Sequence, residues 1–156
     1  MRDAEEKSRE LASLEECARI AGIGISDVVL PSEDKVILGS MRFHYVDWGC
    51  AEKPVILFLH GGNQTGRTWD LVCLQLRQDY RCLAIDQRGH GDSEWSYDGC
   101  YGGEDHRADI EAFAEYKGLD KFLLVGMSMG CFNSMHYAAV NSDRLAGLVT
   151  VDAGPW

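Results

Sequence analysis

Residues 122–131, with the sequence FLLVGMSMGC, decide how the rest of the chain is interpreted. The apolar residues 122–125 are followed by the pattern G-x-S-x-G, in which Gly126 and Gly130 flank Ser128. A strand that turns sharply into a helix crowds its backbone on both sides of the bend, so the flanking positions favour residues without a Cβ atom. The pattern therefore predicts a nucleophile elbow, which lifts the serine hydroxyl above the edge of a sheet.

The residues after this bend continue in a helix-like pattern to about Val140. Backbone amides at the start of such a helix face any negative charge that develops near Ser128. A G-x-S-x-G pattern also arises by chance in chains that contain many Gly and Ser residues. The strand before the pattern and the helix after it favour the functional interpretation.

Size and charge limit the classes of function. The chain has 156 residues, of which 46% are hydrophobic and 26% charged, which suits one domain with a real core. Its net charge is −10, and an acidic surface repels phosphate backbones and anionic lipids, so neither nucleic acid nor a membrane is expected as a partner. No stretch has the length of a membrane span, and the charged start MRDAEEKSRE does not resemble a secretory signal. We expect a cytoplasmic protein.

The six cysteines are scattered, without a C-x-x-C pair. They are Cys17, Cys50, Cys73, Cys82, Cys100 and Cys131. An even number is compatible with disulfides, but a chain without a secretory signal is expected to keep reduced thiols. No Cys/His cluster has the spacing of a zinc site. We expect neither a metal nor another cofactor.

The N-terminal part of the chain differs from the rest. Leu14 and Ala18 belong to an apolar stripe at helical spacing, which predicts an amphipathic helix over residues 5–21. Such an extension either binds a partner or packs loosely on its own domain, and we expect the second. Residues 1–30 are therefore interpreted as a helical extension and residues 31–156 as a partial α/β domain.

Strands and helices alternate after this extension. A hairpin is predicted from residues 35–38 and 41–48, with a two-residue connection between them. Later strands are expected at residues 55–59, 80–85, 121–125 and 145–151, with helices at 69–78, 105–117 and 128–140. The continuously apolar strands suit a parallel sheet covered on both faces. The sequence thus predicts a mostly parallel, doubly wound α/β sheet with helices on both faces and a site at the carboxyl ends of its strands.

Three glycine-rich motifs follow the predicted strands: HGGNQTGRTW at residues 60–69, DQRGHGDS at residues 86–93, and GMSMG at residues 126–130. In this order they resemble the serine-nucleophile branch of the α/β-hydrolase fold family, with its HG oxyanion loop, D-x-R-G-x-G-x-S turn and nucleophile elbow. The closing VTVDAGP also resembles the family strand that follows the elbow helix. The resemblance covers residues 36–156 and only the N-terminal half of the family's fold.

The resemblance implies roles for three residues. Ser128 would attack the substrate, while the backbone N–H groups of Met129 and Gly62 would stabilise the oxyanion. The implied enzyme is a hydrolase that forms an acyl-enzyme from a small-molecule ester, thioester, lactone or related acyl substrate. A serine at position 128 disagrees with haloalkane dehalogenase and epoxide hydrolase chemistry, which needs a carboxylate nucleophile.

Other polar residues in the motifs receive structural roles. The resemblance assigns His60 to the shape of the oxyanion loop and His90 to a turn, while Asp86 and Arg88 are expected to tie that turn together. Four more titratable residues are expected to be structural or solvated: His44, His106, Asp109 and His136. The aromatic segment 94–103 is open to two interpretations, as a pocket wall or as a mobile surface loop.

The sequence departs from the family in its triad. The family order is Ser, then Asp or Glu, then His, whereas no histidine follows His136 here. Asp152 stands where some relatives place the acid, but it also suits a turn before Ala153. Smaller departures are Met127, where His is frequent, and Cys131, where Gly is frequent. We expect an incomplete chain that is inactive or weak as a hydrolase, with the sheet truncated after the strand that follows the elbow helix.

Two other functions compete with this interpretation. A non-catalytic α/β-hydrolase-like binding or scaffold protein would keep the fold without a triad base. A nucleotide-binding Rossmann-like domain would share the buried strands and glycine-rich turns. It is disfavoured because neither G-x-G-x-x-G nor G-x-x-x-x-G-K-S/T follows any predicted strand.

Overall fold

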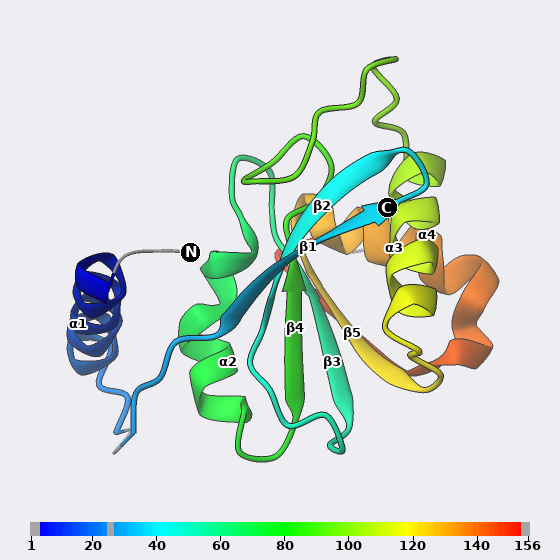
Figure 1. Ribbon diagram of the computed structural model, residues 1–156. Coiled ribbons are helices and arrows are strands. Elements are labelled where there is room, and N and C mark those ends of the chain that lie inside the picture. Colours follow the sequence, from blue (N-terminus) through cyan, green and yellow to red (C-terminus); the bar gives the residue numbers. More distant parts are fainter. Residues whose placement is uncertain (1–3, 25–26, 154–156) are drawn as a thin grey trace.

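A six-stranded mixed sheet forms the centre of the computed structural model (Figure 1), which describes residues 4–24 and 27–153. The predicted helical extension begins at residue 1, and the predicted partial α/β domain ends at residue 156. Both limits lie outside the described residues, as does the final Gly-Pro of VTVDAGP. The strands are β1 (Ser32–Leu38), β2 (Met41–Asp47), β3 (Val55–Leu59), β4 (Arg81–Ile85), β5 (Phe122–Met127) and β6 (Leu145–Val151). The helices are α1 (Ala4–Ile20), η1 (Gly66–Trp69), α2 (Asp70–Leu76), α3 (Gly103–Tyr116), α4 (Met129–Asn141) and η2 (Ser142–Arg144).

The strand order is β1-β2-β4-β3-β5-β6. Strands β4, β3, β5 and β6 are parallel neighbours, while the β1–β2 hairpin joins the sheet through the antiparallel β2–β4 pair. Helical crossovers connect the parallel strands, as parallel pairing requires. The mostly parallel α/β sheet predicted from the sequence is confirmed. Its parallel strands bring the three glycine-rich motifs to one edge.

Helices cover both faces of this sheet. Leu57 and Leu59 of β3 pack in one core cluster with Phe113 of α3, and Ile56 and Phe58 pack in the other, on the side of α2. Successive side chains of a strand point to opposite faces, so an apolar residue at every position is buried only when both faces are covered. This explains why β3 shows no alternation of polar and apolar residues.

Helix α1 lies beside α2 (Figure 1). Leu14 and Ala18 are buried in the same cluster as the α2 side of the sheet, and Glu10 forms an ion pair with Arg67 of η1. The extension therefore packs on its own domain, as expected from its apolar stripe. The domain boundary at residue 30 stays a prediction.

Some element limits differ from the predictions. Strand β1 begins at Ser32, because Ser32 pairs with Asp47 and its hydroxyl donates to the Asp47 carbonyl (3.2 Å). The first residues of this outer strand are polar, so the apolar pattern that predicted the strand did not include them. The helix predicted over residues 69–78 is the shorter α2, and the turn η1 precedes it. Helix α4 begins at Met129, since Ser128 itself forms the bend.

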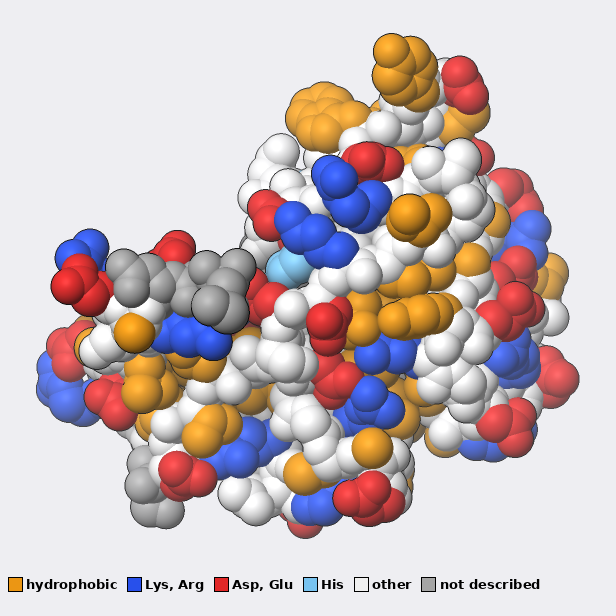
Figure 2. Space-filling view, viewed as in Figure 1, with side chains coloured by type: hydrophobic (Ala, Val, Ile, Leu, Met, Phe, Trp, Pro, Cys, Tyr) orange, Lys and Arg blue, Asp and Glu red, His pale blue; other side chains and the backbone are white. Residues whose placement is uncertain are grey.

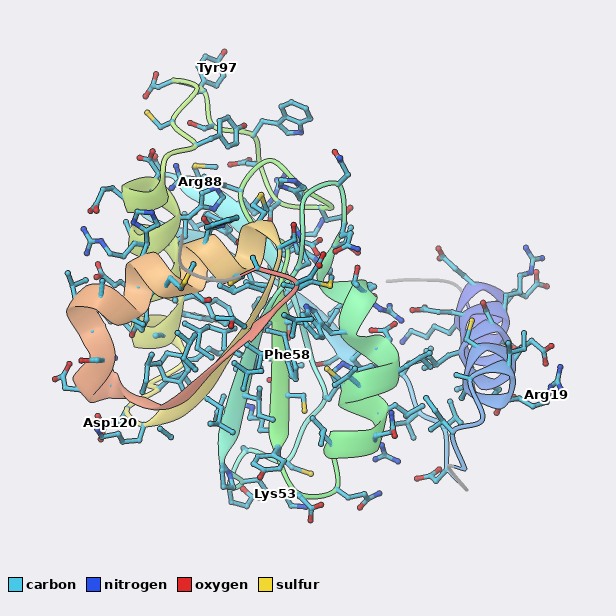
Figure 3. The ribbon with its side chains drawn as sticks, turned by 180° about the vertical axis from the view of Figure 1, so that it is seen from behind. Arg19, Lys53, Phe58, Arg88, Tyr97 and Asp120 are labelled. Carbon is cyan, nitrogen blue, oxygen red and sulfur yellow. The ribbon has the colours of Figure 1, made fainter. Side chains whose placement is uncertain are left out.

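Strand β6 forms one outer edge of the sheet, and among the described residues it pairs only with β5. Figure 3 shows it from behind, running from the end of η2 toward the start of α4. Leu148, Val149 and Val151 are 38%, 48% and 38% exposed, so apolar side chains remain uncovered along this edge. No helix within the described residues has the length and apolar character needed to cross a membrane.

Candidate active site

Ser128 occupies a strained bend between β5 and α4. Its φ of 50° and ψ of −113° are unusual for a residue with a side chain. A Cβ atom on Gly126 would lie 2.2 Å from the Gly130 carbonyl oxygen, and one on Gly130 would lie 2.4 Å from the Leu59 carbonyl oxygen. Both glycines are therefore required by close backbone packing. The Ser128 side chain remains partly exposed at the edge of the sheet.

The loop after β3, residues 60–65, approaches Ser128 from the neighbouring strand. A Cβ atom on Gly61 would lie 3.4 Å from the Ser128 Cβ atom, which shows how closely the two backbones approach. The Gly61 amide donates to the Gln64 Oε1 atom (2.9 Å), so it is engaged within the loop. Within the described residues, the N–H of Gly62 has no hydrogen-bond partner. The roles predicted for Gly62 and Met129 stay predictions.

A chain of buried hydrogen bonds joins all three motifs. The Gln87 amide donates to His60 Nε2 (3.0 Å), and the Gln87 side chain donates to the His60 carbonyl oxygen (2.7 Å). Asn133 of α4 donates to Gln87 Oε1 (2.7 Å). The loop after β3, the turn after β4 and helix α4 are thus held together by paired polar groups, which are costly to break when buried.

His60 is a structural residue of this chain of hydrogen bonds. Its Nε2 atom accepts the Gln87 N–H, so the proton is on Nδ1, which donates to the Gly61 carbonyl oxygen (2.7 Å). Burial lowers the pKa of His60 and keeps the ring neutral. With both nitrogens engaged, His60 is not available as a base, in agreement with the sequence interpretation.

Asp86 ties the second motif together, as predicted, whereas Arg88 joins the motif to α3 and to the aromatic segment. Arg88 forms a two-point ion pair with Asp109 of α3 (2.6 and 2.7 Å) and also donates to the carbonyl oxygens of Cys100 and Asp105. Burial raises the pKa of Asp109, and the Arg88 charge opposes this. Asp109 is therefore a structural carboxylate. Asp86 also contacts residues of other elements.

The remaining histidines outside β2 are His90, His106 and His136, and they lie in three different segments. His90 Nδ1 contacts the Arg88 carbonyl oxygen (3.0 Å), and its ring centroid lies 5.1 Å from that of His60. His106 is buried in α3, and burial lowers its pKa to about 4. His136 lies exposed on α4. Among the described residues, no hydrogen bond joins a histidine to Ser128.

The end of β6 lies next to the elbow. The Ser128 amide donates to the Val151 carbonyl oxygen (2.9 Å), so Asp152 follows at the same edge of the sheet. Asp152 has a φ of 60° and is exposed, a conformation typical of a turn. Its role as a triad acid stays a prediction.

The aromatic segment 94–103 projects from the same end of the molecule. Tyr97 is fully exposed at the tip of this loop (Figure 3), and Trp95 is 77% exposed. Orange side chains accordingly cover the top of the space-filling view (Figure 2). Tyr101 instead folds back, because its hydroxyl accepts the Ser96 N–H (2.8 Å). The outward-pointing rings favour the interpretation of a surface loop.

Sequence reasoning missed three residues that organise this edge: Gln87, Asn133 and His44. Their partners are distant in sequence, for example 46 residues between Asn133 and Gln87. Local patterns carry no signal for such contacts. The described part of the chain also contains no group of His, Cys, Asp or Glu side chains arranged to hold a metal ion.

The geometry agrees with comparisons to known proteins. A family model described as alpha/beta hydrolase fold matches residues 54–156. An esterase of Mycobacterium tuberculosis is 34% identical over 146 residues, which cover 94% of this chain and 46% of the relative. A bifunctional esterase/perhydrolase of Acinetobacter calcoaceticus is 38% identical over 114 residues, 71% of this chain and 41% of the relative.

A solved structure gives the same result. The thioesterase domain from the curacin biosynthetic pathway superposes with a TM-score of 0.74 at 30% identity, covering 79% of this chain and 46% of that domain. The chain thus spans about half the length of the curated relatives it matches. The strand order, the bend at Ser128 and these matches agree: the chain belongs to the α/β-hydrolase fold family.

Proposed function

We propose that this chain carries the nucleophile and oxyanion half of a serine hydrolase site. Ser128 Oγ would attack the carbonyl carbon of an ester, thioester, lactone or related acyl bond. The alcohol or thiol would leave with a proton, and water would then hydrolyse the acyl-enzyme. The backbone N–H groups of Gly62 and Met129 would stabilise the oxyanion that forms in both steps.

The strained bend at Ser128 is the observation that carries this proposal. The combination of φ 50° with ψ −113° is sparsely populated for a residue with a side chain, and such strain is concentrated at functional sites. The close approach of Gly61 to the Ser128 side chain adds a second backbone segment beside the hydroxyl. The N–H of Gly62, which has no hydrogen-bond partner within residues 4–24 and 27–153, gives that segment a donor.

The identity of the nucleophile narrows the chemistry. A hydroxyl group forms an ester with an acyl group, whereas dehalogenation and epoxide opening in this fold need a carboxylate at the same position. The names of three relatives, an esterase, an esterase/perhydrolase and a thioesterase domain, favour acyl substrates. We therefore propose a small-molecule acyl compound as the substrate class.

We propose that the 156-residue chain hydrolyses acyl substrates slowly. A serine hydroxyl needs a base to take its proton, and no histidine contacts Ser128 in the described residues. Oxyanion stabilisation and binding alone leave about 10³–10⁴-fold acceleration over water in triad-deficient serine hydrolases. We expect weak turnover that still depends on Ser128.

The test combines a fluorophosphonate probe with a p-nitrophenyl ester assay on the 156-residue chain. We expect slow labelling of Ser128, identified by mass spectrometry, and no labelling of Ser128→Ala. Ser134→Ala is the matched control, because Ser134 is a buried serine of the helix that follows Ser128, and its hydroxyl donates to the Cys131 carbonyl oxygen. Labelling that survives Ser128→Ala would contradict the proposed nucleophile.

A second candidate function is a non-catalytic binding or scaffold protein with the same fold. The observation that favours it is the lack of a contact between Ser128 and a histidine among the described residues. A binder would retain ligand affinity after Ser128→Ala and show no covalent adduct with any acyl or phosphonate probe. The labelling experiment therefore separates the two candidates.

A further inference from the structure

His44 of β2 is a buried titratable residue outside the three motifs. It is only 7% exposed, and its Nδ1 atom lies 2.8 Å from Asp86 Oδ2. The lowered pKa of Asp86 keeps that carboxylate ionised, so Nδ1 carries the proton and donates it. The backbone N–H of His44 donates to Ser93 Oγ (2.9 Å), which fixes the residue to the turn after β4.

Asp86 transmits this contact to the oxyanion loop. Its Oδ1 atom accepts the Gly66 N–H (2.6 Å), and its Oδ2 atom accepts the Asp92 N–H (3.0 Å). Gly66 follows directly after the loop formed by residues 60–65. The end of the loop is therefore held by the same carboxylate that binds His44.

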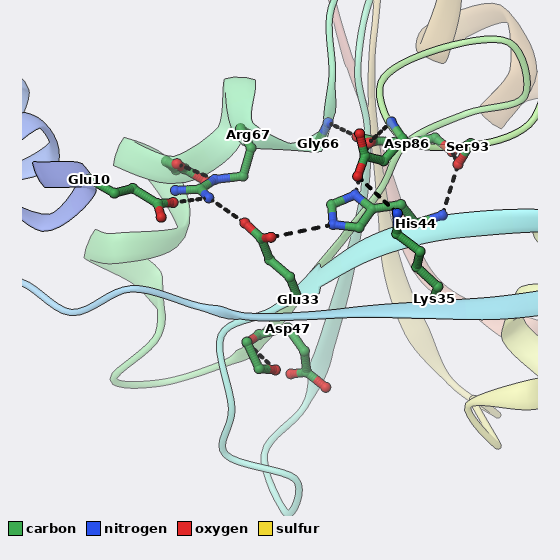
Figure 4. A network of polar contacts seen from close by, with 12 residues as sticks. Glu10, Glu33, Lys35, His44, Asp47, Gly66, Arg67, Asp86 and Ser93 are labelled. Atoms are coloured by element: carbon green, nitrogen blue, oxygen red, sulfur yellow. Dashed lines mark hydrogen bonds and ion pairs between the residues drawn. The ribbon is translucent and has the colours of Figure 1, made fainter. Parts of the chain in front are cut away.

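A second path reaches the same point from the other side of the ring. His44 Nε2 lies 3.8 Å from Glu33 of β1, and Glu33 contacts Arg67 (2.7 Å). Arg67 is the residue after Gly66 and also pairs with Asp70 and with Glu10 of α1. Figure 4 shows the two paths meeting at residues 66 and 67.

We propose that His44 is a positioning residue for residues 60–66. The imidazolium bridges the carboxylates of Asp86 and Glu33. It thereby holds Asp86 against Gly66 and Glu33 against Arg67. Loss of the ring proton removes the charge that unites the two carboxylates and loosens the end of the loop. This inference rests on the proposed function, in which the same loop supplies the Gly62 N–H to the oxyanion.

The charges around the ring favour the protonated form. The hydrogen bond to Asp86 raises the pKa of His44, burial opposes the rise, and the charges of Asp86, Glu33 and Asp92 add to it. Lys35, the cross-strand neighbour of His44, binds Asp92 (3.0 Å). Carboxylates therefore face the ring from both β1 and the turn after β4.

Solvent reaches this region through a cavity. It has a volume of about 710 Å³ between α1 and β1, and its lining includes Lys7, Glu33, Lys35, His44 and Asp92. Its two lysines contribute positive charge and its three carboxylates, Glu33, Asp34 and Asp92, negative charge, so the cavity walls are mixed in sign. An opening of this size gives the His44 ring a path for proton exchange.

The first test is a pH titration followed by NMR, which needs no catalytic activity. We expect the His44 ring and the Gly66 amide to titrate with one shared midpoint above 6.5, the ordinary value for histidine. His44→Gln should abolish the Gly66 transition, while the exposed His136→Gln should preserve it. A Gly66 amide that does not follow His44, or that still titrates in His44→Gln, would overturn the inference.

A second variant keeps the test decisive if His44→Gln fails to fold. Glu33→Gln preserves the Asp86 contact and removes one charge 3.8 Å from Nε2. Coulomb's law in bulk water gives a shift of about 0.8 pH unit for such a charge, which is a lower bound because the ring is buried. The midpoints of His44 and Gly66 should therefore fall together by at least this amount. A fall in the His44 midpoint alone would contradict the coupling.

The second readout is the pH profile of fluorophosphonate labelling at Ser128. We expect the labelling rate to change at the His44 midpoint, and this inflection to be absent from His44→Gln and present in His136→Gln. Coupled NMR titrations with no labelling in any variant would sustain the positioning role and contradict the proposed function. Labelling of Ser128 without a His44-dependent inflection would sustain the function and overturn this inference.

Discussion

His60 and His44 hold the two ends of the loop after β3 by different means. His60 lies at its start, in a neutral chain of hydrogen bonds with Gln87, and its pKa is lowered by burial. His44 acts at its end through Asp86, and its pKa is raised by that carboxylate. The pKa values of two buried imidazoles within one edge of the sheet are thus shifted in opposite directions by their surroundings.

The difference between these two histidines has a general basis. Burial alone disfavours the charged form of an imidazole, and a hydrogen-bonded carboxylate reverses that preference. A neutral network keeps its hydrogen bonds across the physiological pH range, whereas a charged pair depends on one proton. The start of the loop should therefore be insensitive to pH and its end sensitive.

The largest effect is expected from Asp86→Asn. The variant removes the carboxylate that is hydrogen-bonded to the buried His44 ring, leaving Glu33 at 3.8 Å, and retains only one acceptor oxygen for the donors that Asp86 serves. Removing one partner of a buried ion pair costs about 3–5 kcal/mol. Urea denaturation should show this loss of unfolding free energy, whereas Asp98→Asn, on the exposed loop, should change it little. Equal stability of the two variants would show that the charged end of the loop is not stabilising.

A smaller loss is expected from Gln87→Leu, which breaks the neutral end. The His60 carbonyl oxygen and the Asn133 amide would lose their partner while remaining buried. Each unsatisfied buried group costs about 1–3 kcal/mol. The loss, measured by urea denaturation at pH 6, 7 and 8, should be the same at each pH. A loss that changes strongly with pH would remove the distinction between the two ends.

The pH dependence of stability should separate the histidines further. The raised pKa of His44 contributes stability that is present below pH 6.5 and is lost as the pH rises through the folded-state pKa, with a slope of at most about 1.4 kcal/mol per pH unit. The lowered pKa values of His60 and His106 act in the opposite direction, at acidic pH. In thermal unfolding, the His44→Gln variant should lack only the decline in stability at alkaline pH. Persistence of that decline would assign it to another group.

The smallest effect is expected from Lys35→Gln. The ion pair between Lys35 and Asp92 is solvent-exposed, with side chains that are 48% and 66% accessible. Exposed pairs of this kind contribute about 0.2–1 kcal/mol and are screened by salt. We expect a change in unfolding free energy at the low end of this range, which disappears in 0.5 M NaCl, on the order of three to four times physiological ionic strength. A loss of unfolding free energy comparable to that of Asp86→Asn would show that the charged network includes this surface ion pair.

Local sequence patterns predicted the fold and the position of the bend because steric rules act on neighbouring residues. Gly126 and Gly130 are fixed by contacts of 2.2 and 2.4 Å that any Cβ atom would make, and the continuously apolar β3 reflects two covered faces. The polar start of β1 gave no such signal. Its register depends on the pairing of Ser32 with Asp47.

The polar support of the site could not be predicted in the same way. His44 and Asp86 are 42 residues apart, and Gln87 and His60 are 27 apart. Such contacts exist only after the strands have been ordered, and the strand order β2-β4-β3 is what brings them together. The sequence identified Asp86 as a structural residue of its turn but gave no indication that it also binds Gly66 and His44.

The most direct measurement for the whole account is a crystal structure of the chain after fluorophosphonate labelling. We predict a phosphonyl group on Ser128 Oγ, with its free oxygen within hydrogen-bond distance of the backbone N–H groups of Gly62 and Met129. A phosphonyl oxygen directed away from both amides, or an adduct on another residue, would contradict the assignment of this edge as a serine hydrolase site.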